Sequence, residues 1–173
     1  MKIVSRDEVI KALIEDMKVF EKIISKKEVK GENEDNKDNL LARIKNGPTQ
    51  LAMMGLLPYI TFIVSKYEPE KDKQGYTRFL VFLIYILNKL KIIELKNEEN
   101  ENIMKYMEEY DNIRNSKTNN KNEIIEGLSK TIKEFLIKVS GLSEGQKRIL
   151  EKDMLVILEE MKKIYSGLYD SSE

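Results

Sequence analysis

The chain has 173 residues, of which 41% are hydrophobic and 35% are charged. This length suits one domain with its own core, and the composition is too apolar for a disordered chain and too charged for a membrane protein. The sequence contains neither Cys nor His, which excludes disulfides, thiolate nucleophiles, most zinc sites and imidazole-based catalysis.

The N-terminal part is predicted to form an amphipathic helix. Ser5 and Glu8 frame a capping box, and apolar residues then recur at helical spacing as far as Ile24. Acidic residues come too early here for a signal peptide, and no apolar run approaches the ~20 residues of a membrane helix. We therefore expect a cytoplasmic protein. Residues 26–37 are charged and lack an apolar period, so they are predicted to form an exposed loop.

Two helices are predicted for the next segment, residues 39–66. A cap at Asp38 or Asn39 would start a short helix that runs through Lys45. The tripeptide Asn46-Gly47-Pro48 would end that helix, because Asn or Gly suits a left-handed C-terminal position and Pro suits the first turn of the helix that follows. The second helix would then extend from residue 48 to residue 66.

This second helix contains residues that disfavour a straight helix. Pro58 removes a backbone donor and is predicted to kink it. Gly55 costs about 1 kcal/mol relative to Ala, which is commonly offset where another backbone comes close. We therefore predict that Gly55 is a helix-crossing point, with Phe62 on the same face filling the core beside it.

The most apolar helix is predicted for residues 76–95, after a loop over residues 67–75. Its run from Phe79 to Leu87 leaves almost no polar face, so we expect it at the centre of the core. A strand is the alternative for this run, but its length together with the flanking residues favours a helix.

Three further helices complete the chain. A polar helix is predicted for residues 97–114, followed by a loop over residues 116–122 and a helix that ends at Gly141. The last helix begins with the capping box Ser143–Gln146, and residues 167–173 are predicted to be a flexible tail. The sequence therefore predicts an all-α single domain, a bundle of about six or seven helices.

No pattern of catalytic residues is visible. Adjacent carboxylates, such as Glu98 with Glu99 and Glu159 with Glu160, do not face each other on a helix, and we interpret them as solvated. There is no Gly-rich phosphate-binding motif. We expect no enzyme, no cofactor and no metal; a nuclease that holds its metal by carboxylates alone is the remaining enzymatic alternative.

Basic residues at helix ends are the candidate nucleic-acid-binding residues. The 30 basic and 30 acidic residues give a net charge of +0, so a polyanion would have to meet a local basic patch. The candidates flank the 48–66 segment or lie toward the end of the core helix: Lys45, Lys66, Arg78, Lys89 and Lys91. The alternative is that these cations only complement helix dipoles and keep the surface soluble.

The order of residues from 48 to 66 resembles a family signature. A Pro opens the helix, a Gly-Leu pair follows two turns later, a Phe two turns after that, and Ser-Lys ends it: Pro48, Gly55, Leu56, Phe62, Ser65 and Lys66. This pattern resembles the small α-helical subunit of type III-B CRISPR effector complexes, the Cmr RNA-targeting assemblies. The resemblance covers about residues 39–90, and Pro58 departs from it.

The resemblance implies a non-catalytic role in antiviral defence. Such subunits stack along the effector backbone beside the groove in which target RNA pairs with CRISPR RNA. Base pairing would read the sequence, so this chain would need only backbone contacts. Its partners would be other effector subunits, CRISPR RNA and target RNA, with no membrane, and the isolated chain would be a monomer. The alternatives are a small subunit of a DNA-targeting type I CRISPR complex and a helical adaptor that binds a protein partner without nucleic acid.

Overall fold

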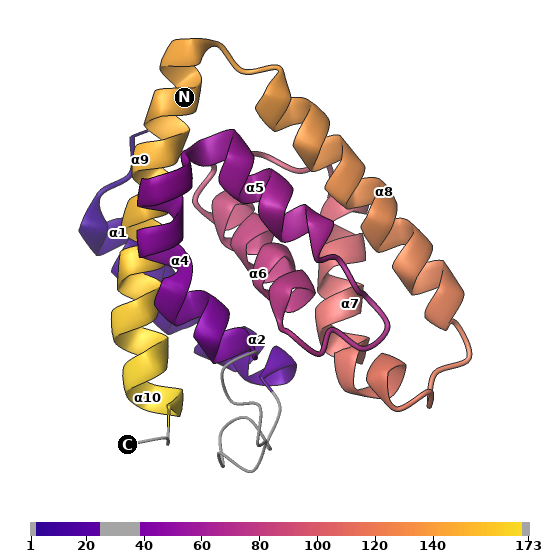
Figure 1. Cartoon of the computed structure of the whole chain (residues 1–173). Coiled ribbons are helices and arrows are strands. Elements are labelled where there is room, and N and C mark those ends of the chain that lie inside the picture. Colours follow the sequence, from indigo (N-terminus) through magenta and orange to yellow (C-terminus); the bar gives the residue numbers. More distant parts are fainter. Residues whose placement is uncertain (1–2, 25–38, 171–173) are drawn as a thin grey trace.

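The computed structural model describes residues 3–24 and 39–170 (Figure 1). Every regular element in these two ranges is a helix, which confirms the all-α prediction. The predicted loop at residues 26–37 and the end of the predicted tail, residues 171–173, lie outside them. The elements are α1 (Arg6–Glu15), α2 (Met17–Ile23), α4 (Leu40–Met54), α5 (Leu56–Ser65), α6 (Tyr76–Lys89), α7 (Asn97–Arg114), α8 (Lys121–Ser140), α9 (Glu144–Met161), the π-helical turn η1 (Lys162–Ser166) and α10 (Gly167–Tyr169).

Helix α6 is the centre of the core, as predicted, and the strand alternative is wrong. From Tyr76 to Leu87 every residue of α6 is buried except Tyr85, which is partly exposed. Helices α4, α5 and α7 pack directly on α6, while α9 packs on α4 and α8 packs on α7 (Figure 1). No helix in the two described ranges has the length and hydropathy that crossing a membrane requires.

The helices are more numerous than the predicted six or seven, partly because the N-terminal helix is interrupted. Asp16, with φ −103° and ψ 16°, separates α1 from α2. The tail prediction also needs correction, because the chain stays helical through Tyr169. Tyr169 donates a hydrogen bond to Glu21 at 2.8 Å, which ties the C-terminal turn to α2.

The break between α4 and α5 lies at Gly55 and not at residues 46–48. Gly55 has φ 83° and ψ 170°, ends α4 and starts α5, so the predicted single helix over residues 48–66 is wrong. Pro48 lies inside α4, where it cannot donate to the carbonyl of Ile44. Pro58 is the third residue of α5, where a backbone N–H has no acceptor within the helix. It therefore does not kink α5.

Gly47, and not Gly55, is the residue at which helices come close together. A Cβ atom at Gly47 would lie 3.3 Å from the Tyr59 hydroxyl and 3.4 Å from a methyl group of Leu158, on α5 and α9 respectively. At Gly55 a Cβ would meet only Glu151, at 3.6 Å. The small residue needed for helix packing is thus the one at which the sequence predicts a helix end.

Candidate functional site

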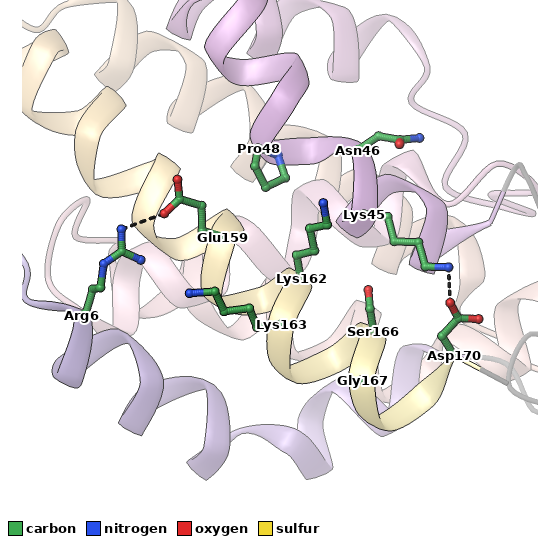
Figure 2. Close-up of a pocket in the computed structure, with 10 residues that line it drawn as sticks. All are labelled: Arg6, Lys45, Asn46, Pro48, Glu159, Lys162, Lys163, Ser166, Gly167 and Asp170. Carbon is green, nitrogen blue, oxygen red and sulfur yellow. Dashed lines mark hydrogen bonds and ion pairs between the residues drawn. The ribbon is translucent and has the colours of Figure 1, made fainter. Parts of the chain in front are cut away.

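A groove of about 770 Å³ lies between the start of α1, the middle of α4 and the C-terminal end of the chain (Figure 2). We call it the α4–η1 groove. Its lining residues come from α1, α4, α9, η1 and α10 and the residue after α10: Arg6, Lys45, Asn46, Pro48, Glu159, Lys162, Lys163, Ser166, Gly167 and Asp170.

The π-helical turn η1 presents basic side chains to this groove because its aromatic residue is fixed in the core. The Tyr165 ring stacks on Phe20 with centroids 4.2 Å apart, and its hydroxyl donates to the Leu13 carbonyl at 2.8 Å. With Tyr165 turned inward, Lys162 points toward α4 and Lys163 points toward Arg6 (Figure 2). Single π-helical turns are rare in proteins, but those that do occur often lie at functional sites.

Most charges in the groove are paired. Arg6 contacts Glu159 and Glu160, each at 2.8 Å, and hydrogen bonds to these two carboxylates raise the pKa of Arg6. Lys163 shares Glu160 at 3.2 Å, and Lys45 pairs with Asp170. With Glu160 counted, four cations meet three carboxylates, so the groove carries a formal excess of one positive charge.

Lys162 and Ser166 are two groove residues whose polar groups have no partner among the described residues. Within residues 3–24 and 39–170, Lys162 forms no ion pair, although its side chain is exposed beside two pairs that do. The Ser166 hydroxyl is buried and has no hydrogen-bond partner in the same ranges. A buried polar atom without a partner is uncommon and is often explained by a ligand or water. An ammonium group and a hydroxyl are together suited to an anionic oxygen ligand.

The structure does not bring the five predicted nucleic-acid-binding residues together. Lys45 lines the α4–η1 groove. Lys66 is exposed at the end of α5, with its ammonium 5.8 Å from the centre of the Phe62 ring. Lys89 and Lys91 line a separate shallow pocket beside α1, where Lys89 pairs with Glu15 at 3.2 Å.

The structure corrects the prediction for Arg78, because its side chain is buried and cannot contact a phosphate at the surface. It is only 1% exposed. Its Nε donates to Asp72 at 2.8 Å, and a terminal nitrogen donates to the Ile23 carbonyl at 2.9 Å. The guanidinium also lies 4.7 Å from the centre of the Tyr110 ring. Arg78 therefore joins the α5–α6 loop to α2 and α7 as a structural residue.

The residues that carry the family resemblance have different environments. Pro48 lines the groove, whereas Leu56 is buried in the core. Phe62 is partly buried and meets Tyr76 edge-on, with ring centroids 5.6 Å apart. Ser65 is exposed and donates its hydroxyl to the Phe62 carbonyl at 2.6 Å.

Two of the carboxylates that the sequence places on solvated faces are instead buried and paired. Glu160 is 4% exposed and forms ion pairs with Arg6 and Lys163. Glu99 accepts from the Lys96 N–H at 3.0 Å and from Lys138 at 3.1 Å. In residues 3–24 and 39–170 no cluster of three or more acidic side chains could hold a metal ion.

Sequence reasoning missed most of the α4–η1 groove. In the sequence Arg6 lies within a predicted capping box, and Lys162, Lys163 and Ser166 lie at the end of the last predicted helix. Arg6 and Glu160 are 154 residues apart in sequence, so no local pattern predicts that they meet. The one local signal in the sequence is the Lys162-Lys163 pair, which interrupts the apolar stripe near the end of the last helix.

Comparison with known proteins adds no family assignment. No protein-family model matches the chain, and no curated protein or solved structure matches it. The resemblance of residues 39–90 to a known family therefore rests on the residues themselves.

Proposed function

We propose that the chain is a non-catalytic structural subunit of a type III-B CRISPR RNA-guided effector complex and contacts RNA phosphates through the α4–η1 groove. The observation that carries this proposal is the position of the groove. The Lys162 ammonium and the Ser166 hydroxyl, which have no partner in the part of the chain that the structure describes, line this groove together with Lys45 and Pro48, at the start of the segment that resembles the family. The partners would be other effector subunits, CRISPR RNA and target RNA, in antiviral defence.

The chemistry of the groove suits a phosphate backbone better than a base. Lys162 and Lys163 offer ammonium donors on flexible stems, and Arg6 offers a guanidinium. Such donors contact phosphates without reading sequence. Each contact adds a modest, salt-dependent free energy, and an assembled complex sums these contributions over its subunits. A neutral chain with a local cationic groove is compatible with this role.

An exposed apolar corner supports a role in an assembly. Met53 is 81% exposed where α4 ends, and Met54 and Leu57 are also exposed on either side of Gly55. Flexible Met side chains suit an adaptable protein contact. We propose that this corner contacts a neighbouring effector subunit. The same corner would serve a helical adaptor, so the experiment below must separate these two functions.

The first experiment is purification of the full chain, tagged, from its native host. Co-purified proteins are identified by mass spectrometry and co-purified nucleic acid by sequencing. We expect CRISPR RNA together with the backbone subunits of a type III-B complex. A DNA-bound particle would support the type I alternative instead, and a protein partner without nucleic acid would support the adaptor and refute the proposal.

A charge reversal then tests the groove within the complex. We expect Lys162→Glu, with or without Lys45→Glu, to weaken target RNA binding by the assembled complex, more strongly at low salt than at high salt. Lys133→Glu is the matched control, because Lys133 is exposed on α8 and has no ion pair in the described residues. If Lys162→Glu and Lys133→Glu weakened target RNA binding equally, the proposal that the groove contacts RNA would be refuted.

A further inference from the structure

We infer that a second, smaller pocket binds the phosphate group of a ligand. This pocket has a volume of about 190 Å³ and lies between the α5–α6 loop and the C-terminal end of α7. Its lining includes the exposed Lys71 and Lys73, the partly exposed Arg114 and the buried Asp72–Arg78 pair. We call it the loop pocket. It shares no residue with the α4–η1 groove.

The charge of the loop pocket is unbalanced. Asp72 is the one carboxylate in its lining and is engaged with Arg78 at 2.8 Å. Lys71, Lys73 and Arg114 form no ion pair in the parts of the chain that the structure describes. The nearest acid along the loop, Glu70, is paired with Lys121 at 3.6 Å. Three cations that line one pocket therefore have no counterion among the described residues.

The pocket is held in place by groups that do not take part in binding. The carboxylate of Asp72 accepts from the Thr77 N–H at 2.8 Å and from the Arg78 N–H at 2.9 Å. The Tyr106 hydroxyl donates to the Pro69 carbonyl at 2.9 Å. These contacts fix the loop against α6 and α7 before any ligand arrives. A ligand would therefore lose little affinity to ordering of the backbone.

The size and the donors define the class of ligand. About 190 Å³ is below the 300–1,000 Å³ typical of pockets for drug-sized molecules, so the pocket holds a group and not a whole nucleotide. An Arg and two Lys match the oxygens of a phosphate, which Arg contacts as a planar fork and Lys as a point charge. The phosphate could belong to a free small molecule or to an RNA backbone, and the two sources are separated by experiment.

The test is a two-dimensional NMR titration of the isotope-labelled full chain with inorganic phosphate and, separately, with a short single-stranded RNA. We expect saturable shifts of the Lys71, Lys73 and Arg114 amides. Shifts with inorganic phosphate would identify a free phosphate ligand, and shifts with RNA alone would identify a backbone phosphate; both support the pocket. If neither probe shifts these amides, the inference is refuted.

Substitution makes the test specific. We expect Arg114→Gln to weaken binding of the effective probe by about tenfold, because a hydrogen bond to a charged group is typically worth that factor. Lys152→Gln is the control, because Lys152 is exposed on α9 and unpaired within residues 3–24 and 39–170. Equal weakening by both variants would show nonspecific attraction and overturn the inference. Because the isolated chain is used, binding here does not depend on the proposed effector complex.

Discussion

Gly55→Ala tests the backbone conformation at the junction between α4 and α5. The structure gives Gly55 φ 83° and ψ 170°, a conformation that is essentially restricted to glycine. If the helix ran without a break from residue 48 to residue 66, Gly55 would instead have helical dihedral angles. The two arrangements predict effects of opposite sign.

The magnitude follows from the local geometry. A Cβ at Gly55 meets only Glu151, at 3.6 Å, so steric clash adds nothing and backbone strain is the main effect. Strain of this kind costs about 1–3 kcal/mol, and Ala restricts the unfolded chain, which offsets about 0.4–1 kcal/mol of that loss. We expect a net destabilisation of about 1–2 kcal/mol. In a continuous helix, Gly55→Ala would stabilise the protein by up to about 1 kcal/mol.

Urea unfolding followed by far-UV circular dichroism measures this difference. We expect Gly55→Ala to lower the urea midpoint, and thermal unfolding to show a Tm lower by about 2–8 °C. Gly145→Ala is the matched control: Gly145 lies in the first turn of α9, and a Cβ there meets nothing within 4 Å. This control is expected to be neutral or slightly stabilising. A Gly55→Ala variant as stable as Gly145→Ala would refute the break at Gly55.

Three further predictions concern other parts of the core. Gly75→Ala should lose at least about 3 kcal/mol of unfolding free energy in the same urea assay, because its φ is 80° and a Cβ would lie 2.4 Å from the Leu40 nitrogen; unchanged stability would contradict the start of α6. Arg78→Met should lower the unfolding free energy by about 3–5 kcal/mol, because Asp72 would stay buried without its cation. The control Lys66→Met should change the unfolding free energy little. An Arg78→Met variant that is stable but binds RNA poorly would show that Arg78 contacts RNA after all. Stability should also fall above about pH 10. Burial together with a hydrogen bond to Glu21 raises the pKa of Tyr169 from 10.0 to about 12. Burial also raises the pKa of four other tyrosines, namely Tyr59, Tyr85, Tyr106 and Tyr165. The unfolded chain loses these protons first, so the unfolding free energy decreases through this window; equal urea midpoints at about pH 9 and about pH 11.5 would contradict it.

Capping residues and apolar runs correctly predict where several helices begin and which helix is central. Ser5, Asn39 and Ser143 each accept a backbone N–H at the start of a helix, as their positions before apolar periods indicate. The central place of α6 follows from its apolar run alone. These features need no knowledge of distant residues.

The errors arise where distant contacts decide between two local possibilities. Both Gly47 and Gly55 could end a helix by their own propensities. Tyr59 and Leu158 leave no room for a larger side chain at Gly47, so that glycine serves packing inside α4 and the break falls at Gly55. The sequence predicts Arg78 as a phosphate contact because it flanks the 48–66 segment. Its burial depends on Asp72 within that loop and on a carbonyl of α2, 55 residues away.

The balanced composition of the chain conceals two local charge excesses. The 30 basic and 30 acidic residues cancel in total, yet the charges that line two separate cavities do not balance. In the α4–η1 groove the carboxylates Glu159, Glu160 and Asp170 pair with every lining cation except Lys162, which has no ion pair within residues 3–24 and 39–170. In the loop pocket Arg78 already occupies the one lining carboxylate, so the other three lining cations have no partner in the same ranges. Net charge therefore describes the long-range field of this protein, and the unpaired cations determine where an anion would bind.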